Sequence, residues 1–156
     1  MTNAIRMYAA RATFTILIVS VNTLALAAEK TQKAHLAKSA EDDTKTFPLA
    51  DLMQRGEKVY IDNCVHCHYG RGQGRPPNAP DAGPGVPALA GSKVANGGKE
   101  AHIDVVLNGR PLTAMLPFKR LSNVELAAVI TYTRNSWGNK AGEVQPSEVK
   151  ARRKGK

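Results

Sequence analysis

Five consecutive residues, Cys64-Val65-His66-Cys67-His68, restrict the possible structures of this chain more than any other part of it. Two cysteines separated by two residues and followed directly by histidine form the attachment signature for a c-type haem. The thiols can bond to the two vinyl groups along one porphyrin edge, and the histidine can then reach the iron. The motif predicts one covalently bound haem c, held by Cys64 and Cys67, with His68 as an axial ligand of the iron.

Three other chemistries use paired cysteines, and the sequence favours haem over each of them. A thioredoxin-like C-x-x-C stands in a βαβ context with a helix that begins at the motif. Here the predicted helix ends at the motif and no strand is evident. A structural zinc site needs four ligands, which Cys64, Cys67 and two histidines could supply. A simple disulfide gives no reason for the histidine beside it.

The composition agrees with a core built around a cofactor. Hydrophobic residues make up 42% of the chain but aromatic residues only 5%, so large side chains that fill small cores are scarce. A buried porphyrin would supply the missing apolar surface. Two cysteines exclude a dense disulfide framework, and the length of 156 residues favours about one domain.

The N-terminal residues indicate export. Arg6 and Arg11 precede a short apolar stretch, and an Ala-Leu-Ala sequence ends at Ala27, so residues 1–27 are predicted to be a secretory signal peptide. The alternative is an uncleaved anchor, although the stretch is short for a membrane span. We expect a periplasmic protein without a nucleic acid partner. Residues 28–46 are polar and are predicted to form a flexible leader.

The following sequence predicts a small all-α domain over residues 47–140. Apolar residues at helical spacing lead up to Cys64, and a second, short helix is expected over residues 99–107. Ser122 and Glu125 form a capping box for the last helix. Three to four helices are expected around one haem. The buried stripe of the last helix is predicted to consist of Leu126, Val129, Ile130, Thr133 and Trp137.

Residues 141–156 form a basic tail, in which five of the last seven residues are cations. We expect a disordered, solubilising end; peripheral contact with anionic lipid or a membrane complex is the alternative. The formal net charge of +9 favours redox partners with acidic docking surfaces. Candidate docking cations near the predicted haem loops are Lys93, Lys99, Arg110, Lys119 and Arg120.

A second axial ligand must come from elsewhere in the chain. Met115 stands in a loop with a proline on each side, which suits a rigid holder for a thioether. Ligation by methionine and histidine raises the reduction potential. Met53 lies on the apolar face of the first helix, where core packing is the commoner role. We predict Met115 as the ligand, with His102 as the alternative for a bis-His site.

With these residues assembled, the segment from about Asp51 to Asn139 resembles a class I cytochrome c. Within that family it is most similar to the cytochrome domain at the C-terminus of certain haem–copper oxidase subunits II, through the segments PALAGSKV, HIDVVLNGRPLTAM and LSNVELAAVITYTRNSWGN. A subunit II also carries a binuclear copper centre with two further cysteines, which this chain lacks. The chain therefore resembles the haem domain alone. Its loop at residues 75–83 is longer than the one usual in that family.

The resemblance also implies two packing contacts. Gly56 and Tyr60 should pack against an aromatic residue of the final helix, for which Tyr132 is the candidate. The carbonyl group of Pro87, or alternatively of Pro84, should accept the Nδ1–H of His68 and orient the imidazole.

An iron with both axial positions filled by protein side chains carries electrons instead of binding substrate. The expected function is therefore one-electron transfer between respiratory-chain partners, without catalysis. The alternative is a haem c subunit of a terminal oxidase or of a periplasmic dehydrogenase complex. A haem enzyme or gas sensor would need an open sixth position, and a thiol-redox or zinc protein would carry no covalent haem.

Overall fold

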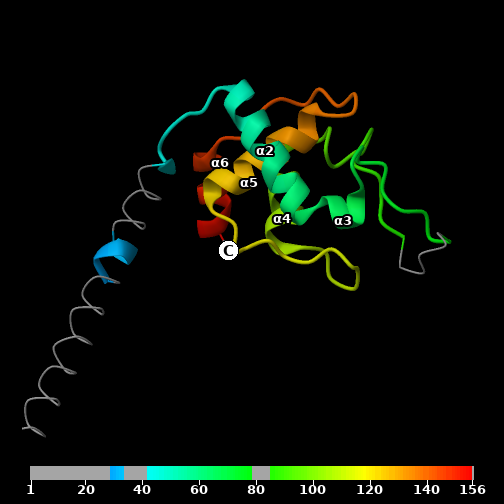
Figure 1. The fold of residues 1–156 in the computed structure, drawn as a ribbon, viewed down its shortest axis with the longest axis horizontal. Coiled ribbons are helices and arrows are strands. Elements are labelled where there is room, and N and C mark those ends of the chain that lie inside the picture. The colour runs from blue at the N-terminus through cyan, green and yellow to red at the C-terminus, as the bar shows by residue number, and fades with distance from the viewer. Residues whose placement is uncertain (1–28, 34–41, 79–84, 156) are drawn as a thin grey trace, which may run out of the picture. The chain divides into compact units, whose positions relative to one another are not determined.

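A computed structural model describes residues 29–33, 42–78 and 85–155. The chain divides into two compact units, Met1–Ala40 and Glu41–Lys156, and each is considered by itself. In the first unit the described residues are helical. The predicted signal peptide lies outside the described residues. The second unit contains helices α2 to α6 and all of the predicted site residues (Figure 1).

Helix α2 (Leu49–Asn63) and helix α5 (Asn123–Asn135) pack together at the centre of the second unit (Figure 1). They approach closely at Gly56, where an added Cβ atom would lie 2.1 Å from the carbonyl oxygen of Ala128 and 2.7 Å from the Cβ atom of Tyr132. Beside this contact, the rings of Tyr60 and Tyr132 lie 5.4 Å apart between centroids. The predicted packing of Gly56 and Tyr60 against Tyr132 is confirmed.

The predicted start of the last helix is also confirmed. The Ser122 hydroxyl accepts a hydrogen bond from the Glu125 amide at 3.2 Å, and the Glu125 carboxylate accepts one from the Ser122 amide at 2.8 Å. The short helix expected over residues 99–107 is α4 (Lys99–Asn108). It ends at Asn108, and the next residue, Gly109, has a φ of +69°, a conformation that glycine adopts readily.

The expected position of Trp137 within the last helix is wrong. Helix α5 ends at Asn135, and the chain continues through an extended Ser136 to Trp137, which has a φ of +55°. The indole ring nevertheless packs on Tyr60, with 5.1 Å between centroids. Trp137 therefore packs on the same core as the helix although it lies after the end of α5. For this reason the apolar periodicity predicted a helix that is too long.

The expectation of a disordered basic tail is wrong for most of its length. Residues Pro146–Lys154 form helix α6, which begins with proline at its first turn and buries Val149 completely. Its cations also meet acids of other segments: Arg152 pairs with Asp104 of α4, and Lys150 with Asp43. The run of cations was expected to face only solvent, but in the structure two of them contact other segments of the chain.

The segment before α2 contacts the segment before α6. The amide of Phe47 donates to Oε1 of Gln145 at 2.9 Å, and Nε2 of Gln145 donates to the Phe47 carbonyl at 3.0 Å. Phe47 itself is buried. These reciprocal bonds join the first and last parts of the second unit.

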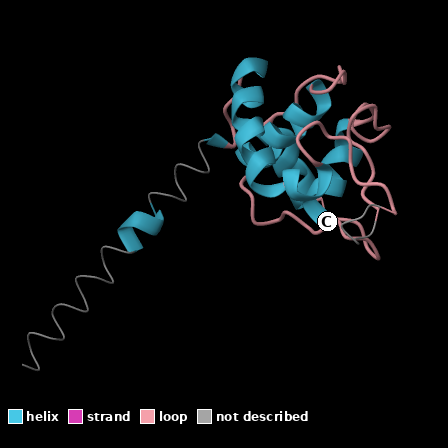
Figure 2. Ribbon diagram, turned by 45° about the vertical axis from the view of Figure 1, so that its right-hand side comes forward, coloured by secondary structure: helices cyan, strands magenta, loops and turns pink. Residues whose placement is uncertain are grey.

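The fold class is all-α, as predicted. Figure 2 shows helices joined by loops, and within the described residues the only β-type pairing is an isolated bridge between Arg75 and Val86. Between the motif and α4, the described residues 69–78 and 85–98 form no helix, as their glycines and prolines predict. In the described part of the chain, no helix combines the length and the apolar character that a membrane span requires.

Candidate haem site

The two thiols lie on one short turn of helix. Cys64 stands where α2 ends and α3 (Val65–His68) begins, and its carbonyl accepts the His68 amide at 2.9 Å. Both cysteines are free; Cys64 is half-buried and Cys67 is exposed. Burial, with a smaller effect of Cys67, raises the pKa of the Cys64 thiol to about 12, while Arg120 opposes the rise. The thiol is therefore uncharged at neutral pH.

The imidazole of His68 is oriented by the backbone. Its Nδ1 lies 3.2 Å from the carbonyl oxygen of Pro87. A carbonyl only accepts, so this contact places the proton on Nδ1 and leaves Nε2 as the lone-pair nitrogen. Burial lowers the pKa of His68, and the bond to Pro87 acts in the opposite direction. Between the two prolines that the sequence offered for this contact, Pro87 makes it, whereas Pro84 lies outside the described residues.

Met115 lies in a hydrogen-bonded loop between α4 and α5. The Met115 carbonyl accepts the amide of Arg110 at 3.0 Å, and the Met115 amide donates to the Thr113 hydroxyl at 3.2 Å. Gly109 passes so close that an added Cβ atom would lie 2.5 Å from the Met115 carbonyl oxygen. The methionine is half-buried, but its neighbours Leu112 and Leu116 are exposed, the latter by 69%.

The two alternative ligands lie elsewhere. His102 is on the buried face of α4, only 3% exposed, beside the guanidinium of Arg134. Its Nδ1 atom is buried without a hydrogen-bond partner. The pKa of His102 is lowered to about 4, first by burial and then by the positive charge of Arg134. Met53 is half-buried on α2.

Two contacts near the motif involve residues whose roles the sequence did not reveal. The hydroxyl of Tyr60 donates to the Tyr69 carbonyl at 2.7 Å, which ties the residue after α3 to the crossing of α2 and α5. The buried amide of Asn139 donates to the Leu89 carbonyl at 3.0 Å and accepts the Gly91 amide at 2.9 Å. Asn139 thus holds the segment that follows Pro87. A lone asparagine after a helix gives no signal of such contacts.

These residues fit a c-type haem. Two free thiols stand within one helical turn, the adjacent imidazole has one nitrogen fixed and the other available, and apolar side chains of the Met115 loop are uncovered. A porphyrin would bury such apolar surface, which otherwise stays in water at a cost. The four-ligand zinc site is not assembled, because the described residues contain no group of three or more His, Cys, Asp or Glu side chains able to hold a metal ion.

The structure separates the candidate docking cations into two groups. Lys99 pairs with Glu148 at 3.1 Å, and Arg120 donates to Asn63 at 2.5 Å. Lys99 is half-buried, whereas Arg120 is exposed. The other three are exposed on loops: Lys93, Arg110 and Lys119.

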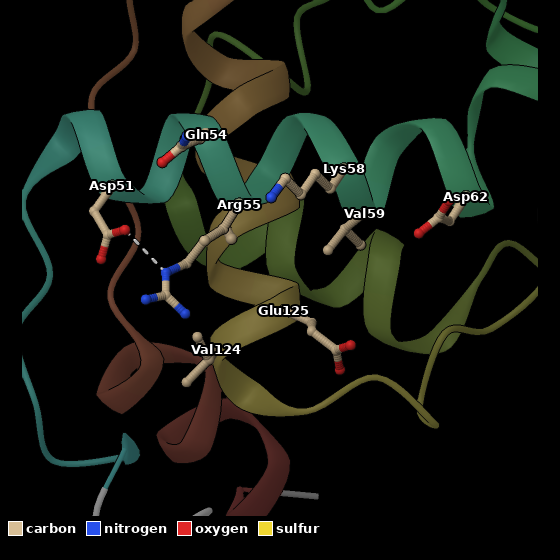
Figure 3. A pocket seen from close by; sticks show the side chains of 9 residues that line it. Asp51, Gln54, Arg55, Lys58, Val59, Asp62, Val124 and Glu125 are labelled. Carbon is tan, nitrogen blue, oxygen red and sulfur yellow. Dashed lines mark hydrogen bonds and ion pairs between the residues drawn. The ribbon is translucent and has the colours of Figure 1, made fainter.

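A shallow groove lies on another part of the molecule, between the outer faces of α2 and α5. Its volume is about 510 Å³, and none of the predicted haem residues lines it. Figure 3 shows mainly charged side chains there, with Asp51 paired to Arg55 at 3.0 Å. This groove does not resemble the apolar setting that the predicted cofactor needs.

A family model described as "Cytochrome C oxidase, cbb3-type, subunit III" matches residues 51–132 of the chain. The match covers the motif, the Pro87 segment, the Met115 loop and the crossing of α2 and α5, and supports haem c binding and electron transfer. No curated protein matches the chain.

Proposed function

The chain belongs to the family described as cytochrome C oxidase, cbb3-type, subunit III, and on this premise we propose that it is an exported monohaem c-type cytochrome. It carries single electrons between respiratory-chain partners and is not itself a catalyst. When bound, the haem supplies a one-electron couple between Fe(III) and Fe(II). The observation that carries the proposal is the contact between His68 and the Pro87 carbonyl, beside two free thiols on the same turn.

Each residue of the site has one task in this proposal. The thiols of Cys64 and Cys67 would hold the haem through two thioether bonds, and Nε2 of His68 and the sulfur of Met115 would be the ligands of its iron. Pro87 keeps the His68 ring in one orientation, and a hydrogen-bonded imidazole is a stronger ligand.

The partners follow from charge and family. The exposed cations Lys93, Arg110 and Lys119 are suited to a transient contact with an acidic surface. The family match favours a second possibility, that the chain is a haem c subunit of a terminal oxidase. The similarity to the cytochrome domain of subunit II remains a sequence resemblance; a haem domain of either subunit would transfer electrons in the same way.

Potentiometric titration of the exported, haem-loaded protein tests the proposal. A reversible change in the visible spectrum with a slope of about 59 mV per tenfold change in redox ratio is expected for a one-electron couple. Rapid binding of carbon monoxide to the reduced protein would instead indicate an open iron position. Co-purification with oxidase subunits from membranes would distinguish the subunit from a free carrier.

A further inference from the structure

The C-terminal helix α6 has contacts that electron transfer by itself does not explain. Its most extensive contact is made by Arg153, which is half-buried. Nε of Arg153 donates to Oδ1 of Asn123 at 2.6 Å, and Nη1 donates to the Lys119 carbonyl at 3.0 Å. Nη2 donates to the Leu121 carbonyl. One guanidinium thus binds three points between residues 119 and 123.

Arginine is suited to this task because its guanidinium is a rigid planar fork with several donors. Lysine would offer a single ammonium and could not reach the same three acceptors with fixed geometry. Hydrogen bonds from a charged donor are also stronger than neutral ones. The arrangement therefore depends on the type of side chain and not only on its charge.

Helix α6 is itself held firmly, so Arg153 has a stable base. Val149 and Pro146 are completely buried. Nε of Arg152 donates to Asp104 of α4 at 3.1 Å, and Glu148 pairs with Lys99 at the start of α4. The helix is thus fixed to α4, from whose end the Met115 loop departs.

The segment that Arg153 binds leads directly back to Met115. The amide of Leu121 donates to the Phe118 carbonyl at 3.1 Å, and the Phe118 amide donates to the Val106 carbonyl at 3.1 Å. Met115 lies three residues before Phe118. Since Leu112 and Leu116 are exposed, their side chains pack little against the rest of the chain, and hydrogen bonds at the base of the loop contribute to its position.

We propose that Arg153 is a positioning residue for Met115, and that helix α6 acts as a clamp on the loop that carries this methionine. In this proposal the basic tail holds the Met115 loop in place and does not bind lipid. The inference rests on the proposed role of Met115 as the sixth ligand.

The test compares three variants of the full-length, haem-loaded protein: Arg153→Gln, Arg153→Lys and Lys154→Gln. The last removes the same charge from the exposed neighbouring residue. Three quantities are measured: the long-wavelength iron–sulfur band of the oxidised protein, the midpoint potential, and hydrogen exchange at the amides of Phe118 and Leu121.

For Arg153→Gln we expect exchange at these two amides to become about tenfold faster, since charge-assisted bonds to the segment are lost. The iron–sulfur band should weaken and the midpoint potential should fall. Arg153→Lys should give intermediate changes, and Lys154→Gln should leave all three quantities as in the wild type. If circular dichroism shows that Arg153→Gln does not fold, the same three quantities are measured in Arg153→Lys. A band and a potential unchanged in that variant would then overturn the inference.

An unchanged band and potential in Arg153→Gln, or equal changes in Lys154→Gln, would overturn the inference. Failure of the underlying site looks different: Met115→Ala would then retain the iron–sulfur band of the wild type. The two failures are separable because the first leaves the effect of Met115→Ala intact.

Discussion

Among the single residues of the site, hydrogen bonds and burial set the protonation of His68 and Cys64 and the main-chain position of Met115. In His68, the contact of Nδ1 with the Pro87 carbonyl leaves Nε2 as the nitrogen able to bind a metal. Cys64 is kept uncharged by burial. Met115 has its backbone fixed on both sides by hydrogen bonds, while the loop around it faces solvent. Hydrogen bonds thus orient the His68 ring and fix the main chain of Met115 before any cofactor is considered.

Replacement of Met115 by alanine should remove the sixth ligand. We expect a high-spin or ligand-accepting iron, loss of the long-wavelength sulfur band, and a midpoint potential lower by about 0.1 V or more, within the range of about 0.8 V that axial ligands span. Visible spectroscopy and potentiometry measure these changes. Met53→Ala is the matched control on α2 and should keep the band; loss of the band in that variant alone would move the ligand to Met53.

His102 makes stability depend on pH. Its pKa is about 4 in the folded protein, against 6.5 for a free histidine, because burial and Arg134 disfavour the charged form. Between these values the unfolded chain binds more protons, so the free energy of unfolding should fall as pH drops from about 6.5 to about 4, by about 3 kcal/mol in total. Denaturant unfolding at a series of pH values measures this slope.

The variant His102→Leu should flatten that slope, since it removes both the titrating ring and the unpaired buried Nδ1. His66→Gln, which replaces an exposed histidine, should retain the wild-type slope. A slope that persists in His102→Leu would show that other groups cause the acid sensitivity.

At the scale of the element, the sequence predicted those helices whose signals are local. The capping box at Ser122 and the glycine after α4 predicted helix ends correctly. Helix α6 was missed because its apolar side chains are few and its cations pair with distant acids such as Asp104 and Asp43. Such pairs exist only once the chain is folded, so a run of cations in sequence does not reveal them.

The crossing of α2 and α5 should be the packing contact most sensitive to added volume. In Gly56→Ala the new methyl group would meet backbone at 2.1 Å, so the two helices must separate. We expect the free energy of unfolding to fall by about 3 kcal/mol, at the upper end for overpacking. Gly70→Ala is the control, since a Cβ atom there meets nothing within 4 Å. Denaturant unfolding followed by circular dichroism compares the two, and equal stability would contradict a tight crossing.

For the molecule as a whole, the haem motif and the surface cations differ in how well the sequence predicts them. The motif predicts covalent haem because thioether attachment demands a fixed spacing in sequence, and the family match supports haem c binding. The candidate docking cations were harder to choose, because Lys99 pairs with Glu148 and Arg120 donates to Asn63. Lys93, Arg110 and Lys119 are exposed on loops. Exposure and pairing are properties of the folded chain and do not follow from position in sequence.

The net positive charge should govern electron exchange with small charged reagents. We expect oxidation of the reduced protein by the anion hexacyanoferrate(III) to slow as ionic strength rises, because salt screens the attraction. Arg110→Gln should lower the rate severalfold at low salt, whereas Lys58→Gln, on the outer face of α2, should change it less. Stopped-flow spectroscopy measures the rates, and equal effects of the two variants would argue against a docking role for the Met115 loop.

Covalent attachment of one haem by Cys64 and Cys67 can be tested by intact mass spectrometry of the denatured protein. The protein should be exported in a host with cytochrome c maturation machinery. We predict the mass of the chain from Ala28 plus one haem, because thioether bonds survive denaturation. A mass without haem would exclude covalent attachment and would favour a disulfide or a zinc site at the two cysteines.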